Sequence, residues 1–234
     1  MTRAFIHVIR GSPSRKPAAS NRSLCTIKGT VMKTIGIIGA GQIGNAIAQQ
    51  LARLNIEATL ANSRGPETLH DQVRQLGPSI KAGTREDAAA KDIVFVAVPW
   101  NQLREALTGL PDFKGRIVVD TTNPLQKQPF AAIDIGGHAS SALVAQMVPG
   151  ARLVKAFNHH AYWNLAADPV KEGGQRILFY AGEDAAAKAE IASLIERLGF
   201  FGADMGDIET GSRFFQPPTG PLAGPNLVKM ELQV

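Results

Sequence analysis

The chain alternates between short apolar runs and segments whose apolar residues recur every three or four positions. Three apolar runs have the composition of buried parallel strands: residues 35–38, 92–98 and 115–120. Between the first two, residues 42–54 carry Ile43, Ile47 and Leu51 on one helical face. Strands that alternate with helices in this way predict a Rossmann-like α/β fold, doubly wound around a mostly parallel sheet.

The remaining periodic segments extend this pattern to residue 206, with a Pro- and Gly-rich extension at residues 207–234. Further strands are expected at residues 57–61, 80–82, 152–156, 176–181 and 200–204. Further helices are expected at residues 67–76, 101–110, 140–148 and 184–198, with one short helix near 227–232. Asn101 is the expected cap of its helix, and Thr84 with Asp87 forms a capping-box pattern. We expect residues 125–137 to be irregular and residues 157–174 to be a long loop.

A glycine-rich turn separates the first strand from its helix, with Gly39, Gly41 and Gly44 in the spacing G-x-G-x-x-G. Gly39 permits a tight turn, Gly41 lets a pyrophosphate approach the backbone, and Gly44 lets the helix lie close to the strand. The first N–H groups of the helix then face the phosphates. The pattern favours a dinucleotide site, although an ordinary turn that binds nothing has the same glycines.

The end of the second strand, Asn62-Ser63-Arg64, indicates which dinucleotide binds. NAD-binding turns place an acidic residue there for the ribose hydroxyls, and an acid would repel a 2′-phosphate. A serine hydroxyl and an arginine instead bind phosphate through charge-assisted hydrogen bonds. We therefore expect NADP(H), the alternative being that Arg64 is a solvated loop charge.

Two later strand ends should complete the cofactor site, because ligands of doubly wound folds bind at the carboxyl edge of the sheet. Ala97, Val98 and Pro99 should run beside the ribose and nicotinamide. Asn123 and Pro124 should lie deeper, near the reacting ring. Both prolines are also explained by simple strand termination.

The loop at 157–174 is the expected pocket for a second substrate, because it follows a strand at the same edge and carries aromatic residues. An exposed histidine there is more often solvated than catalytic, and the adjacent His159 and His160 are a poor metal pair. We find no catalytic residue set and no metal-ligand spacing. Direct hydride transfer between stacked rings requires orientation and water exclusion more than an acid or base.

Charge is concentrated in the leader, residues 1–31, which has six basic residues, no acidic residue and the only cysteine, Cys25. Of the 25 basic residues, 19 then remain against 20 acidic residues, which gives no argument for nucleic acid or a membrane surface. The leader is interpreted as a disordered extension or a wrongly assigned start. The rest suits a cytoplasmic protein.

Together these residues resemble the deazaflavin (coenzyme F-420)-dependent NADP oxidoreductase family. The resemblance is carried by the glycine turn, the Ser63-Arg64 pair, Val98-Pro99-Trp100, Asn123-Pro124 and Lys155-Ala-Phe-Asn158. It implies that Ala40, Gln42 and Ile43 contact the pyrophosphate and that Ala156 and Phe157 border the nicotinamide. The chain departs from the family in the turn Gly65-Pro66-Glu67-Thr68, where some members carry a further basic residue, and at the histidine pair and the tail.

The expected activity is hydride transfer between NADP(H) and a deazaflavin or flavin-like ring, a small-molecule redox substrate. Substrate contacts are expected from Pro124, Asn158, His159 and Trp163. The alternative is an NADP(H) sensor without turnover. We also expect a homodimer in which the tail and the 157–174 loop close the site. Imine and hydroxyacid reductases share the opening motif but carry a large helical domain, for which few residues follow Asp204.

Overall fold

The computed structural model describes residues 33–127 and 130–231, of which residues 127 and 130 are described by backbone alone. The expected leader with Cys25 lies outside the described residues, as do the last three positions of the tail. Residues from Lys33 onward group into one compact unit. Among the described helices, none is both long and apolar enough to cross a bilayer.

The described strands form a ten-stranded sheet and a separate two-stranded ribbon. The main order is β3-β2-β1-β4-β5-β8-β10-β11, parallel from β3 to β8, with β10 antiparallel to β8. The strands are β1 (Ile35–Ile38), β2 (Ala58–Ala61), β3 (Ile80–Ala82), β4 (Ile93–Val96), β5 (Ile117–Asp120), β6 (Leu125–Lys127), β7 (Phe130–Ala132), β8 (Arg152–Ala156), β9 (Val170–Lys171), β10 (Gly174–Gly182), β11 (Phe201–Asp204) and β12 (Val228–Lys229).

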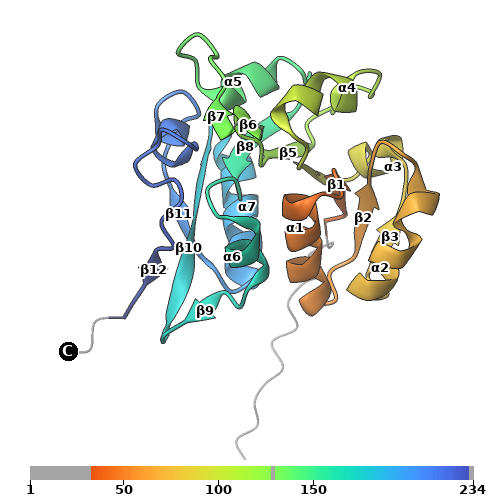
Figure 1. Ribbon diagram of the computed structural model, residues 1–234, viewed down its shortest axis with the longest axis horizontal. Helices are drawn as coiled ribbons and strands as arrows, with labels where there is room; N and C mark the ends of the chain where they lie inside the picture. Colours follow the sequence, from red (N-terminus) through yellow and green to blue (C-terminus); the bar gives the residue numbers. More distant parts are fainter. Residues whose placement is uncertain (1–32, 128–129, 232–234) are drawn as a thin grey trace, which may run out of the picture. The chain divides into compact units, whose positions relative to one another are not determined.

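Helices cover both faces of the sheet, as expected of a doubly wound fold (Figure 1). α1, α2 and α7 contribute to the core of one face, and α3, α4 and α5 to that of the other. The helices are α1 (Gln42–Arg53), α2 (His70–Leu76), α3 (Arg85–Ala89), α4 (Leu103–Leu107), α5 (Ser140–Ala145), α6 (Tyr162–Ala166) and α7 (Ala185–Arg197), with the 3₁₀ helices η1 (Pro66–Leu69), η2 (Trp100–Gln102) and η3 (Gly211–Phe215).

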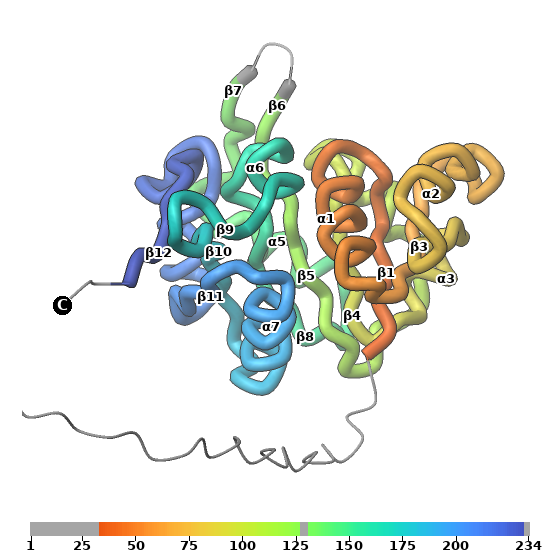
Figure 2. The backbone as a smooth tube through the Cα atoms, turned by 90° about the horizontal axis from the view of Figure 1, so that it is seen from below, coloured from red at the N-terminus to blue at the C-terminus, as the bar shows by residue number. Residues whose placement is uncertain are grey.

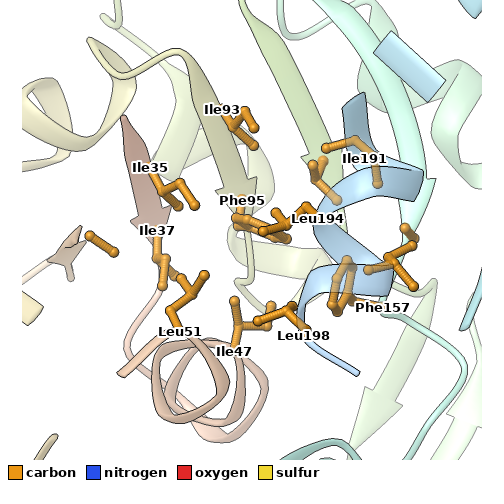
Figure 3. Packing of buried hydrophobic residues seen from close by; sticks show 14 of the residues in the cluster. Ile35, Ile37, Ile47, Leu51, Ile93, Phe95, Phe157, Ile191, Leu194 and Leu198 are labelled. Atoms are coloured by element: carbon orange, nitrogen blue, oxygen red, sulfur yellow. The ribbon is translucent and has the colours of Figure 1, made fainter. Parts of the chain in front are cut away.

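The core on the α1 and α7 face is built from the apolar positions that predicted these elements. Figure 3 shows Phe95 of β4 among Ile37 of β1, Leu51 of α1 and Leu194 of α7. The side chain of Phe95 is completely buried. The sheet and the helices therefore share one apolar layer, which fixes the carboxyl ends of β1, β4 and β5 relative to α1.

Several predicted elements are confirmed at residue level. β3 has the expected bounds, and Pro66 opens the first turn of η1. Thr84 and Asp87 form the reciprocal hydrogen bonds of a capping box at α3. These features depend on local sequence, which explains why they could be read without tertiary information.

Other predictions are wrong because tertiary pairing outweighs local pattern. The segment expected to be irregular contains the antiparallel β6–β7 ribbon, which Figure 2 shows projecting from the remaining strands. Asn101 does not cap a long helix, since η2 begins after Pro99 and α4 ends at Leu107. The helix expected near 227–232 is instead β12, which pairs with β10. The expected 157–174 loop includes α6 and β9.

The tail packs against β10 of its own chain. Phe215 is completely buried and lies with Phe179 and Ala181 in a small apolar cluster. The Ile177 N–H donates to the Leu227 carbonyl at 3.0 Å, and the Arg176 guanidinium donates to Asn226 Oδ1. This cluster covers the face of β10 opposite the α7 core.

Candidate functional site

The glycine turn after β1 is crowded on its protein side and open on its outer side. Gly39 has φ +113°, and a Cβ there would lie 2.3 Å from the Ala97 carbonyl oxygen. A Cβ on Gly44 would lie 1.8 Å from the Gly39 carbonyl oxygen. No atom lies within 4 Å of a Cβ built on Gly41. A ligand can therefore approach the backbone at Gly41, beside the first turn of α1.

The Asn62-Ser63-Arg64 corner is held by hydrogen bonds from Asn62. Its Oδ1 accepts from the Arg64 backbone N–H at 2.9 Å, and its Nδ2 donates to Thr68 Oγ1 at 2.9 Å. The Ser63 and Arg64 side chains are exposed and make no hydrogen bond or ion pair with another described residue. The corner thus presents a fixed backbone and an unpaired guanidinium.

One cleft of about 940 Å³ joins the turn, the corner and the end of β4. Nine residues predicted from the sequence line it: Gly39, Ala40, Gly41, Asn62, Ser63, Arg64, Ala97, Val98 and Pro99. The cleft is also lined by residues that sequence reasoning missed, among them Arg85, Gln102, Glu105 and Thr108. The Arg85 side chain already has a partner within the protein, because its Nη1 donates to the Glu105 carbonyl at 2.8 Å.

The other predicted site residues do not line this cleft. Gln42, Ile43 and Gly44 form the first turn of α1. Asn123 and Asn158 form a reciprocal pair, in which Asn123 Nδ2 donates to the Asn158 carbonyl at 2.8 Å and Asn158 Nδ2 donates to Asn123 Oδ1 at 3.0 Å. Asn158 Nδ2 also donates to the Phe215 carbonyl at 3.1 Å, which ties the strand-end loops to the tail.

Three predicted site residues, Pro124, Ala156 and Phe157, offer little side-chain surface to a ligand. All three are buried. Phe157 has φ +60°, and its ring stands edge-on to Phe95 with centroids 5.3 Å apart. A ligand at this edge would therefore meet the backbone of residue 157, because its ring belongs to the core.

A buried ion pair lies behind these loops, and sequence reasoning did not find it. Lys155 Nζ lies 3.0 Å from Asp120 Oδ2, and both side chains are completely buried. Lys155 also donates to the Thr122 carbonyl at 2.5 Å, and Asp120 accepts from Ser141 Oγ at 2.6 Å. Burial lowers the pKa of Lys155, and the Asp120 carboxylate opposes that shift. The only signals in the sequence were a lysine and an aspartate within otherwise apolar strands.

The expectation of exposed histidines in the 157–174 segment is wrong. The exposed fractions of His159 and His160 are 2% and 3%, and Nε2 of both rings lies within hydrogen-bond distance of the Ile177 carbonyl. Burial, together with the neighbouring His160, lowers the pKa of His159 to about 3. His159 packs 4.9 Å from Phe179 between ring centroids. Its side chain therefore belongs to the core beside the tail.

Trp163 is the predicted substrate residue that remains accessible, with an exposed fraction of 62%. It lies on α6, which Gln50 of α1 holds in place by donating to the Leu165 and Ala167 carbonyls at 2.7 and 2.8 Å. No group of three or more His, Cys, Asp or Glu residues within the described ranges is arranged to hold a metal ion.

A parallel sheet with a glycine turn and an open cleft at the carboxyl ends of its strands defines a Rossmann-type nucleotide-binding domain. Residues 34–124 match the family model of coenzyme F420-dependent NADP oxidoreductases. A candidate F420-dependent NADP reductase of Arthrobacter sp. FB24 is 28% identical, with a TM-score of 0.62 over 76% of this chain and 86% of that one. Both matches confirm the resemblance to this NADP oxidoreductase family that was seen in the sequence.

Two further proteins are similar to most of this chain. A hypothetical protein of Sinorhizobium meliloti is 40% identical, with a TM-score of 0.81 over 85% of this chain and 96% of that one. The metalloreductase STEAP3 of Rattus norvegicus is 28% identical over 198 residues, which are 83% of this chain. The chain spans 38% of the length of that relative.

We predict that Lys155→Met lowers the free energy of unfolding by about 3–5 kcal/mol, because Asp120 would be left as an uncompensated buried charge. Adding Asp120→Asn should recover part of the loss, since the charge is then removed. Urea unfolding of both variants measures this. A double variant less stable than Lys155→Met alone would contradict the account.

Stability should also fall in acid because of the buried histidines. The unfolded state takes up a proton near the ordinary pKa of 6.5, whereas folded His159 does so only near 3. The free energy of unfolding should therefore decrease from about pH 6.5 downward, by up to about 1.4 kcal/mol per pH unit for this residue. The pKa of His160 is lowered in the same direction.

The matched variant is His159→Gln, which keeps an amide donor for Ile177 and removes the titrating ring. Its stability should depend less on pH between 6.5 and 4, as measured by urea unfolding across that range. Equal slopes in variant and parent would show that His159 does not titrate in this way.

Proposed function

We propose that the protein transfers hydride between NADP(H) and a deazaflavin or flavin-like ring. The observation that carries this proposal is the single cleft joining an open glycine turn to an unpaired Ser63-Arg64 corner. A dinucleotide needs both features at once, one for its diphosphate and one for its 2′-phosphate.

The residues fit NADP(H) in three parts. Ser63 and Arg64 would hold the 2′-phosphate, since both side chains are free of partners among the described residues. Gly41 and the first turn of α1 would hold the diphosphate. Val98, Pro99 and the backbone beside Phe157 would border the nicotinamide, at the carboxyl ends of β4 and β8.

When bound, the nicotinamide supplies the hydride or accepts it. The protein then has to align two flat rings and exclude water from between them. The reciprocal Asn123–Asn158 pair and the buried Lys155 keep the loops at this edge in place. Hydride transfer between two rings requires no acid or base within this edge, so a site built for orientation suffices.

The cofactor half of the proposal predicts that Arg64→Ala weakens NADPH binding by roughly 10- to 100-fold, because charge-assisted hydrogen bonds to the phosphate are lost. NADH binding should change less than threefold, since NADH lacks that phosphate. Titration of both cofactors by calorimetry measures the difference. Arg74→Ala is the control, because Arg74 is exposed on α2 and paired with Asp71. Equal weakening of NADPH and NADH binding would show that Arg64 does not bind the 2′-phosphate.

The decisive experiment for turnover is stopped-flow mixing of the protein and NADPH with a deazaflavin or FMN. We expect ring reduction and NADPH oxidation to proceed together at a catalytic rate, and to slow in Arg64→Ala at subsaturating NADPH. Tight NADPH binding without reduction of either ring would instead identify an NADP(H) sensor. A homodimer stays a prediction, which light scattering at working concentration tests.

A further inference from the structure

One end of the cofactor cleft has lining residues that neither the phosphates nor the nicotinamide account for. Glu105 and Ala106 of α4 lie three and four positions after Gln102, so the three residues share one helical face toward the cleft. Leu103 and Leu107 are buried and hold α4 in the apolar core. The cleft therefore has a third surface, in addition to the glycine turn and the phosphate corner.

Arg85 ties this surface to the end of the cleft where the 2′-phosphate would lie. Arg85 is the first residue of α3, which follows β3, and β3 pairs with β2. Its Nη1 donates to the Glu105 carbonyl at 2.8 Å and to the Ala106 carbonyl at 3.2 Å. The carboxyl end of α4 is thereby held on the β2 and β3 side of the sheet, whereas β5 and β8 lie on the other side of β1 and β4.

The covalent structure of NADP(H) determines which group reaches this surface. The 2′-phosphate is carried by the ribose that bears adenine, whereas the nicotinamide ribose lies on the far side of the diphosphate. A phosphate held by Ser63 and Arg64 therefore brings adenine to the same end of the cleft. The surface on α4 is within reach of that base.

The Glu105 carboxylate is the distinctive group of this surface. Its side chain is exposed and makes no hydrogen bond or ion pair with another described residue. A carboxylate weakens the binding of a phosphorylated ligand through charge repulsion, unless the ligand donates a hydrogen bond to it. Adenine has such a donor in its N6 amine, beside ring nitrogens that accept. The unpaired Gln102 carboxamide can donate to one of those nitrogens.

We propose that this surface recognises the adenine base of NADP(H), with Glu105 accepting a hydrogen bond from the N6 amine and Gln102 donating to a ring nitrogen. This inference rests on the proposed function and deepens it, because it names a second part of the cofactor that the protein selects. A base with a carbonyl in place of the amine presents a lone pair to the carboxylate and binds less tightly.

The test compares NADPH with its hypoxanthine analogue, reduced nicotinamide hypoxanthine dinucleotide phosphate. The analogue keeps the net charge, the 2′-phosphate and the nicotinamide, and it has a C6 carbonyl where NADPH has the amine. Calorimetric titration of the full-length protein gives the dissociation constant of each ligand, with competition against NADPH for weak binding. The ratio of the two constants measures recognition of the base.

We expect the parent protein to bind NADPH about tenfold more tightly than the analogue, as the loss of a charge-assisted hydrogen bond implies. Glu105→Gln should bring the two constants within about twofold of each other, because a carboxamide can accept from the amine or donate to the carbonyl. The substitution also removes a negative charge. That change affects two ligands of equal charge alike, so their ratio does not report it.

Glu86→Gln is the matched control. Glu86 is exposed, follows Arg85 in α3 and is not among the residues that line the cleft. Its Oε1 lies 3.5 Å from Arg85 Nη2, and in the variant Arg85 keeps both of its carbonyl partners on α4. The variant removes the same charge without touching the base, so the parent's ratio should persist.

Two outcomes would overturn the inference. They are equal binding of NADPH and the analogue by the parent protein, and a ratio that Glu105→Gln leaves unchanged. A hydrogen bond from the ribose 3′-hydroxyl to Glu105 would give the first result, since the analogue has the same ribose. Failure of the parent protein to bind NADPH would count against the proposed function instead, so the two failures are distinguishable.

Discussion

The close approach of α1 to β1 is the constraint on which the site depends. A side chain at Gly39 or Gly44 would collide with backbone, so the turn can form only from glycine at these two positions. The same approach leaves Gly41 facing open space and aims the first turn of α1 at that space. Packing and ligand access thus come from one arrangement of three residues.

Buried polar groups hold the loops at the carboxyl ends of β5 and β8 in place. Lys155 of β8 and Asp120 of β5 lie near the carboxyl ends of their strands, and their hydrogen bonds to the backbone of Thr122 fix the segment that follows β5. Such a pair is costly to bury, and its partners must all be present for the cost to be offset. The loops at this edge are therefore held by directional bonds in addition to apolar packing.

Much of the cofactor half could be predicted from sequence because its signals are local. The glycine spacing, the Ser63-Arg64 pair and the capping box at Thr84 each lie within a few residues, and the cleft unites nine of the predicted positions. The distant features could not be predicted in this way. Pairing of β12 with β10, burial of His159 against Phe179, and the Lys155–Asp120 pair all join segments far apart in the chain.

The bond from Asn158 to the Phe215 carbonyl has a consequence for biosynthesis. On a ribosome, every strand from β1 to β8 is complete before residue 215 has been added. The edge where Asn123 and Asn158 meet nevertheless lacks one of its supports until then. A nascent chain could acquire its glycine turn early, whereas the opposite end of the site would mature only when η3 leaves the exit tunnel and docks on β10.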